Sequence, residues 1–176
     1  MSQSINLYNQ LANHKLFNKS VNFGLKRIKI ALRLLGHPEK KLKNVISVIG
    51  ESGKFTTLFS LKSFIEANNE KVTAHISPSI QDIKERFYMS KKYLTHNEIK
   101  KTIKKIEKLN IPLTVFECLT LVYIINASKI NADYNIQETG ALWRLDSNNI
   151  HDFPRVQICT NTVSYTHLTL PTTSSV

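Results

Sequence analysis

Apolar residues recur along the chain with two different spacings, and segments of the two kinds alternate. Helical spacing marks the segments 21–35, 55–67, 95–109 and 116–127. Short β-branched or alternating runs, typical of strands, occupy 45–49, 71–76, 134–137 and 155–159. Strands that alternate with helices in this way predict an α/β fold, with a mostly parallel sheet flanked by helices. In such sheets ligands bind at the carboxyl ends of the strands.

Stop signals and a capping box set the helix boundaries, and helical spacing explains a run of lysines. Gly36 and Pro38 are expected to stop the first helix, and Thr95 with Glu98 forms a capping box before the third. The lysines of that third helix fall mostly on the face opposite its apolar stripe. We interpret them as a solvated helix face and expect no nucleic-acid partner, because no aromatic residues interleave them.

Composition limits the class of protein. The chain has 176 residues, 41% of them hydrophobic, with only five glycines and five prolines, which predicts one globular domain with a sizeable core. The formal net charge of +11 favours anionic partners, such as nucleotide phosphates, a polyanionic metabolite or nucleic acid. Charge alone does not choose among them.

The two cysteines and the apolar content predict a compartment. Cys118 and Cys159 have neither zinc-site nor disulfide spacing, which favours a reducing cytoplasm. The N-terminus lacks the apolar core of a signal peptide, and no stretch reaches the roughly 18 to 20 apolar residues that span a bilayer. We therefore expect a cytoplasmic monomer with no membrane partner.

The last residues differ from the rest. Segment 163–176, VSYTHLTLPTTSSV, has no charged residue and is rich in threonine and serine. It resembles translated adapter read-through at the end of a truncated gene model. We expect a non-native tail there, and residues 1–162 to be the N-terminal part of a truncated domain.

The turn after the first strand carries the main candidate chemistry. It reads G-x-x-G-K-x-T at Gly50, Gly53, Lys54 and Thr56, and Val48 stands where the longer phosphate-loop pattern needs glycine. Two glycines let backbone N–H groups approach phosphate oxygens, and the following helix adds a positive N-terminus beside Lys54. An ordinary glycine-bearing loop is the alternative. The position of this turn between an apolar strand and a helix favours a phosphate site.

The histidines add no site to this picture. His37, His75 and His96 show no metal-ligand spacing to one another. We expect each to be a surface or packing residue, and Cys118 to lie in the core.

The shortened loop resembles the G-T-N-G-K-G-[ST] signature of the Mur ligase superfamily. Other motifs, in the same order and spacing, are similar to those of the dihydrofolate synthase/folylpolyglutamate synthase family. They are Gly24-Leu-Lys-Arg-Ile28, Leu35-Gly-His-Pro38, Ser77-Pro78, Glu85-Arg86, Phe116-Glu117 with Thr120, Glu138-Thr-Gly140, and Arg144-Leu-Asp146 with Asn149. The resemblance covers residues 24–161 and implies a P-loop, Mur-ligase-like ATP-binding domain.

That family joins L-glutamate to dihydropteroate or a folate with ATP and Mg²⁺, through an acyl phosphate. The resemblance implies catalytic roles for Lys54 and Glu138, and Mg²⁺ ligation by Ser77 and Glu138. The implied ATP-binding residues are Gly50, Glu51, Ser52, Gly53, Lys54 and Thr56. The implied substrate-binding residues are Asn22, Phe23, Gly24, Leu25, Thr114, Val115, Phe116, Glu117, Leu145, Asp146 and Ser147.

Without the resemblance, simpler interpretations of three of these residues stay open. Ser77 could form a turn before Pro78, Glu138 could be a solvated loop acid, and Glu117 could be an acid favoured by a helix start.

Several residues depart from the family pattern. Glu51-Ser52 replaces Thr-Asn, Phe55 and Ser79 replace a glycine and a histidine, and Leu142-Trp143 replaces Gly-Gly. A carboxylate at 51 and a ring at 55 are unfavourable beside phosphates. Two alternatives to an active folate ligase therefore remain, a non-catalytic nucleotide- or folate-binding homologue and a cell-wall Mur-type amino-acid ligase. A basic nucleic-acid-binding domain is a weaker third.

Overall fold

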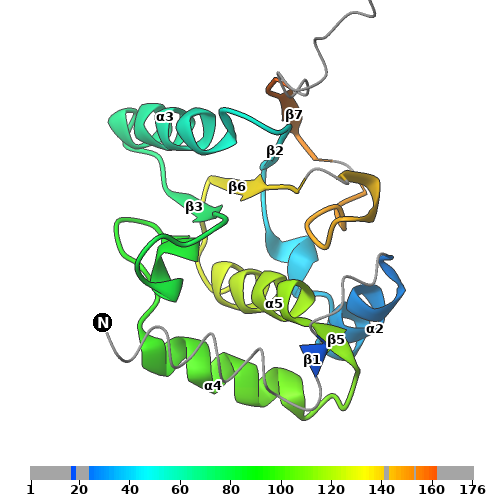
Figure 1. The fold of residues 1–176 in the computed structure, drawn as a ribbon. Coiled ribbons are helices and arrows are strands. Elements are labelled where there is room, and N and C mark those ends of the chain that lie inside the picture. Colours follow the sequence, from blue (N-terminus) through cyan, green and yellow to red (C-terminus); the bar gives the residue numbers. More distant parts are fainter. Residues whose placement is uncertain (1–16, 19–23, 141–142, 153, 162–176) are drawn as a thin grey trace, which may run out of the picture.

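The computed structural model describes residues 17–18, 24–140, 143–152 and 154–161. Its main feature is a five-stranded sheet in the order β4-β3-β6-β2-β7 (Figure 1). The strands are β2 (Val45–Ile49), β3 (Val72–His75), β4 (Phe87–Met89), β6 (Tyr134–Glu138) and β7 (Val156–Cys159). All neighbouring pairs are parallel except β3 with β4, so the predicted mostly parallel α/β sheet is confirmed.

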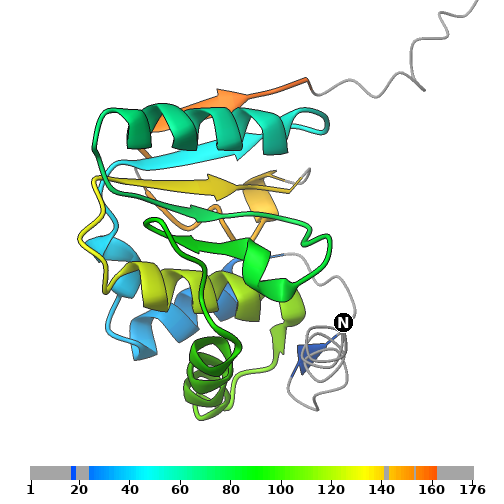
Figure 2. The ribbon, with the colours of Figure 1, turned by 90° about the vertical axis from the view of Figure 1, so that its left-hand side faces the viewer.

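The described residues form four α-helices around the sheet: α2 (Lys26–Leu34), α3 (Lys54–Ala67), α4 (His96–Glu107) and α5 (Val115–Ala127). Figure 2 shows α3 on one face and α5 on the other, with α2 and α4 beyond α5. Two apolar cores result, one between α3 and the sheet and a larger one around α5. Because α5 is apolar on nearly all sides, it is buried between the sheet and the outer helices.

Short elements complete the fold. Single 3₁₀ turns cover Pro38–Lys41, Ile83–Arg86 and Trp143–Leu145. A small parallel pair joins β1 (Phe17–Asn18) to β5 (Leu113–Thr114).

Several predicted boundaries are confirmed closely. Strand β2 matches its prediction, and α4 begins with the predicted capping box, in which the Thr95 amide donates to Glu98 Oε2 at 2.8 Å. All five α4-region lysines at 100, 101, 104, 105 and 108 are exposed.

The first helix is shorter than predicted. It begins at Lys26, because Gly24 has φ 135° and Leu25 is the N-cap. Residues 21–23 lie outside the described part, as does segment 162–176. Within the described residues, no helix is long and apolar enough to cross a membrane.

Candidate functional site

The glycine–lysine turn connects β2 to α3 at the carboxyl edge of the sheet. Gly50 and Gly53 have φ values of 128° and 84°, which residues with a side chain rarely adopt. A Cβ at Gly50 would also lie 2.1 Å from Thr160 Oγ1, after β7. Helix α3 spans 14 residues with no acid in its first turn, so its positive N-terminus faces the turn uncompensated by a local carboxylate.

Lys54 folds back over this turn. Its Nζ donates to the carbonyls of Gly50 at 2.7 Å and Glu51 at 3.1 Å. The same atom lies 3.9 Å from Glu138 Oε1 at the end of β6. The lysine charge is therefore held between the turn and a carboxylate on the neighbouring strand.

Glu138 connects a third strand to this cluster. Its Oε2 accepts a hydrogen bond from the Ser77 amide, just after β3, at 2.8 Å. Burial raises the pKa of Glu138, while the Ser77 amide, Lys54 and Arg86 oppose that rise. Lys54, Ser77 and Glu138 thus meet at the carboxyl ends of β2, β3 and β6, where parallel sheets bind ligands.

The oxygen chemistry of this cluster suits a hard cation. A hydroxyl and a carboxylate, at Ser77 and Glu138, are ligands of the kind that Mg²⁺ accepts while it keeps several waters. The described residues contain no group of three or more His, Cys, Asp or Glu that could hold a metal ion. A cation here would depend on water or on ligand oxygens for its remaining coordination.

The turn amides have partners from the end of β7. Glu51 N and Ser52 N both donate to the Asn161 carbonyl, at 2.9 and 3.3 Å. One oxygen therefore accepts two neighbouring N–H groups, as a phosphate oxygen does in a backbone nest.

The residues of the turn that depart from the family pattern are exposed. They include Glu51 and Ser52, and the motif residue Thr56 is exposed as well. Phe55 is 47% exposed, and its ring packs at a tilt against Phe59 one helical turn further on, with centroids 4.4 Å apart.

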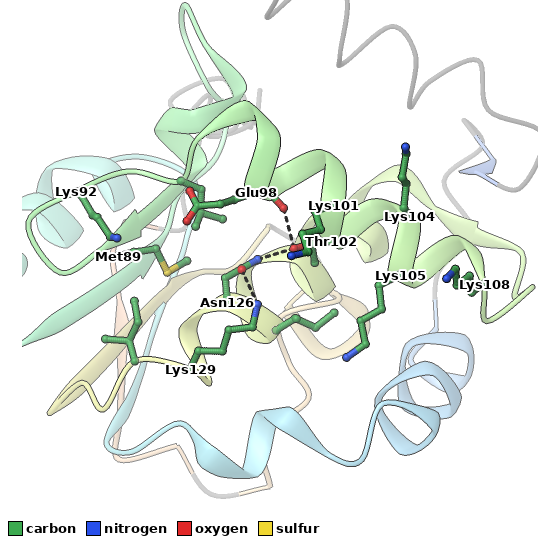
Figure 3. Close-up of a pocket in the computed structure, with 13 residues that line it drawn as sticks. Met89, Lys92, Glu98, Lys101, Thr102, Lys104, Lys105, Lys108, Asn126 and Lys129 are labelled. Carbon is green, nitrogen blue, oxygen red and sulfur yellow. Dashed lines mark hydrogen bonds between the residues drawn. The ribbon is translucent and has the colours of Figure 1, made fainter.

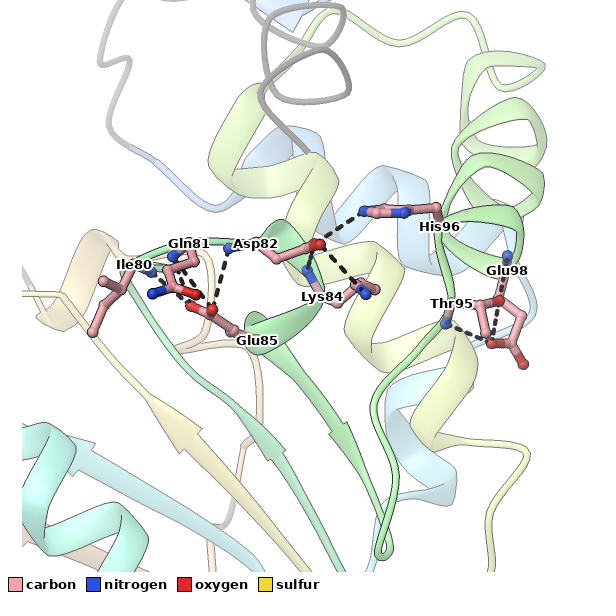
Figure 4. A network of polar contacts seen from close by, with 8 residues as sticks. All are labelled: Ile80, Gln81, Asp82, Lys84, Glu85, Thr95, His96 and Glu98. Atoms are coloured by element: carbon pink, nitrogen blue, oxygen red, sulfur yellow. Dashed lines mark hydrogen bonds and ion pairs between the residues drawn. The ribbon is translucent and has the colours of Figure 1, made fainter. Parts of the chain in front are cut away.

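The segment after Ser77 is fixed by Glu85 (Figure 4). The Glu85 carboxylate accepts from the amides of Ile80, Gln81 and Asp82, the shortest at 2.7 Å. Asp82 in turn bonds His96 Nε2 at 3.0 Å, which joins this segment to the start of α4. Ser79, where the family pattern has histidine, is partly exposed in this segment.

The predicted substrate segments come together around the start of α5. Glu117 is buried, accepts from the Thr114 amide at 2.7 Å and pairs with Arg27 Nε of α2 at 3.1 Å. Thr120 Oγ1 lies 2.7 Å from Ser147 Oγ. Gly24 and Leu25 directly precede α2, whose Arg27 contacts Glu117, and segment 145–147 includes Ser147, which contacts Thr120. Both segments therefore border the first half of α5, where Phe116 and Leu145 are about half exposed. Asn22 and Phe23 lie outside the described residues.

Asp146 stabilises the loop between β6 and this region. Its carboxylate accepts from the amides of Gly140 at 3.0 Å and Asn148 at 2.8 Å. Burial raises the pKa of Asp146, and these hydrogen bonds oppose the rise. Leu142 lies outside the described residues.

Sequence reasoning missed a positioning pair next to Glu138. His75 Nδ1 lies 3.1 Å from Asn148 Oδ1, and Asn148 Nδ2 donates to the Glu138 carbonyl at 2.8 Å. The His75 ring is stacked between Phe87 and Tyr123. Burial lowers the pKa of His75 to about 4, so it is neutral at pH 7. The expectation of a packing role for His75 is confirmed, and only its buried strand position signalled it.

The site combines a glycine turn after β2, the helix that follows this turn, and a lysine–carboxylate pair across the ends of β2 and β6. These features define a P-loop, Mur-ligase-like α/β domain. Searched against models of protein families, the chain matches none. It is 30% identical over 138 residues to the dihydrofolate synthase/folylpolyglutamate synthase of Buchnera aphidicola, covering 77% of this chain and 33% of that protein. The Bacillus subtilis protein of the same name is 26% identical over 166 residues, covering 89% and 38%.

Solved structures agree. E. coli FolC in complex with DHPP and ADP has a TM-score of 0.82 at 30% identity, covering 92% of this chain and 39% of that one. A bifunctional folylpolyglutamate synthase/dihydrofolate synthase with Mn, AMPPNP and L-glutamate has a TM-score of 0.72 at 29% identity, covering 77% and 34%. The chain belongs to the dihydrofolate synthase/folylpolyglutamate synthase family. It spans between 33% and 38% of the length of these curated relatives.

Proposed function

We propose that this chain is the nucleotide-binding part of an ATP-dependent ligase that joins L-glutamate to dihydropteroate or a folate. The observation that carries the proposal is the meeting of Lys54, Ser77 and Glu138 at the ends of three neighbouring strands. Support comes from relatives with solved structures that contain ADP, AMPPNP, Mn, L-glutamate or DHPP.

In this proposal the turn 50–54 and Thr56 hold the ATP phosphates. A phosphate oxygen would take the place of the Asn161 carbonyl on the amides of Glu51 and Ser52. Lys54 Nζ would exchange the carbonyls of Gly50 and Glu51 for phosphate oxygens, a stronger charge-assisted contact. Ser77 and Glu138 would hold Mg²⁺, which supplies positive charge to the phosphates when bound.

The reaction places two anions together. The acceptor carboxylate attacks the γ-phosphate, ADP leaves, and the amino group of L-glutamate then displaces phosphate from the acyl phosphate. Catalysis of such a step consists largely of positioning and charge neutralisation. Lys54, 15% exposed and already beside the carbonyls of its own turn, would neutralise the developing charge.

The pterin-bearing acceptor would bind where segments 24–25, 114–117 and 145–147 meet. Exposed Phe116 and Leu145 offer apolar surface there, and the part-buried Arg27–Glu117 pair holds the start of α5 in place. We further propose that the protein is a cytoplasmic monomer, and that the 176-residue chain binds nucleotide without completing turnover.

The test measures ADP release by a protein that contains this chain and has the full length of its relatives. Release that requires both dihydropteroate and L-glutamate supports the proposal. Release that requires a cell-wall precursor and a different amino acid supports a Mur-type ligase instead.

One observation favours a non-catalytic homologue as the second candidate. The chain already supplies partners to two turn amides and to Lys54, and Glu51 and Phe55 depart from the family pattern. ATP binding without ADP release under any substrate combination would support this second candidate.

A further inference from the structure

A concave surface lies at the other end of the sheet from the candidate site. It is a groove of about 720 Å³ between α4, α5 and the end of β4 (Figure 3). Met89 in its floor pairs with Thr73 at the start of β3, and Lys129 follows the last turn of α5. The groove is therefore separate from the carboxyl ends of the strands, where Lys54 and Glu138 lie.

The floor of this groove is apolar and pre-formed. Met89, Leu94 and Ile125 line it while remaining almost fully buried. Asn126 Nδ2 donates to Thr102 Oγ1 at 3.0 Å and to the Val122 carbonyl at 2.8 Å, which fixes α5 against α4. Because these polar groups have partners, the floor offers carbon surface to a ligand.

The rim is strongly positive. The thirteen described residues that line the groove include six lysines and one glutamate. Lys101, Lys105 and Lys108 follow one side of α4 at helical spacing, and Lys129 stands across from them on the α5 side (Figure 3). The glutamate, Glu98, is already bonded to the amide and hydroxyl of Thr95.

We propose that this groove binds an acidic amphipathic helix of a partner protein. A helix in a groove between two helices places apolar side chains on the floor at helical spacing. Its flanking carboxylates would meet the lysines of both rims, and the ladder Lys101–Lys105–Lys108 matches carboxylates spaced by three or four residues. The charge and the apolar floor are then both complemented by one ligand.

The lining chemistry favours a peptide over other anions. Among the described lining residues there is no arginine and no aromatic side chain, the groups that stack on bases in single-stranded nucleic acids. A flat anionic membrane would contact the lysines but leave the apolar floor of the groove uncovered.

The test is fluorescence anisotropy of the 176-residue chain with a labelled synthetic helix that bears leucines on one face and glutamates beside it. A double variant, Lys101→Glu with Lys105→Glu, should weaken binding by at least about tenfold, since two attractions become repulsions. The matched control, Lys29→Glu with Lys100→Glu, makes the same change in net charge at exposed helical lysines that do not line the groove. It should bind like the unmodified chain.

Four outcomes would overturn the proposal. They are no binding of the acidic helix, equal weakening by both double variants, equal binding of a glutamate peptide without leucines, and tighter groove-dependent binding of DNA or phosphatidylserine vesicles. Circular dichroism of each variant separates loss of binding from loss of fold.

Discussion

Lys54 Nζ and Glu138 Oε1 lie 3.9 Å apart at the ends of two parallel strands that are neighbours in the sheet but distant in sequence. Both side chains are largely buried, with 15% and 5% of their surfaces exposed. A cation and an anion held this closely beside backbone amides can each contact a different part of a metal–phosphate ligand. The predictions below separate this role from a purely structural ion pair.

Glu138→Gln should weaken cation binding without lowering the stability of the fold. Burial raises the pKa of Glu138, so its charge is unfavourable in the folded chain, whereas glutamine still accepts from Ser77 N. We expect the variant to be at least as stable in urea unfolding at pH 7 and to bind Mn²⁺ with ADP about tenfold more weakly. Electron paramagnetic resonance measures free Mn²⁺. Glu70→Gln, away from the site, is the control, and equal Mn²⁺ affinity in all three proteins would contradict the metal role.

Gly50→Ala should destabilise the chain more than Gly53→Ala. Both glycines have positive φ, but only at Gly50 would the new Cβ meet Thr160 Oγ1, at 2.1 Å. We expect a loss of about 2 to 3 kcal/mol for Gly50→Ala and about 1 kcal/mol for Gly53→Ala in urea unfolding. Adding Thr160→Ala to Gly50→Ala should recover part of the loss. A double variant no more stable than Gly50→Ala would show that the contact with Thr160 does not matter.

His75 should give the folded state a pH-dependent stability. Burial lowers its pKa from 6.5 to about 4, so the unfolded chain binds the proton more readily. The folded state therefore keeps its full stability above pH 6.5. It loses free energy of unfolding as the pH falls toward 4, by an amount on the order of 3 kcal/mol. His75→Gln should flatten the dependence of unfolding free energy on pH in that window. His37→Gln, at a side chain 43% exposed, is the comparison variant. Equal slopes in the two variants would refute this role for His75.

Arg27 and Glu117 should be strongly coupled. Arg27→Met leaves a carboxylate that is 5% exposed without its cation, which we expect to lower the unfolding free energy by about 2 kcal/mol or more. Lys26→Met, at the exposed neighbouring position, should change it little. In a double-mutant cycle, Glu117→Gln should cost less when Arg27 is already methionine. Additive effects would argue against coupling across α2 and α5.

The sequence predicted those parts of the fold that have strong local signals. Strand β2 is a β-branched run that leads into a glycine turn, and the Thr95–Glu98 capping box marks the start of α4. Strand β4 was missed because its three residues, Phe87–Met89, form too short a run to show a period, and segment 76–86 separates it from its partner β3. The two-residue strands β1 and β5 were missed for the same reason.

The site was predictable in its components but not in its contacts. The carboxyl-end rule for parallel sheets predicted a ligand site at the edge of the sheet where Lys54 and Glu138 lie, and the family resemblance implied roles for both residues. The Asn161 carbonyl on the turn amides and the His75–Asn148–Glu138 chain depend on side-chain and backbone geometry between distant segments. No periodicity in the sequence encodes such contacts.

The measurement that tests the central claim most directly is calorimetric titration of ATP with Mg²⁺ into the 176-residue chain and its Lys54→Ala variant. Loss of a charge-assisted contact to phosphate should weaken ATP binding by about ten- to a hundredfold, and circular dichroism of the variant checks that the fold is retained. Lys71→Ala, an exposed lysine before β3, is the matched control and should bind ATP normally. Equal ATP affinity in the Lys54→Ala variant and the unmodified chain would contradict the assignment of this turn as a phosphate site.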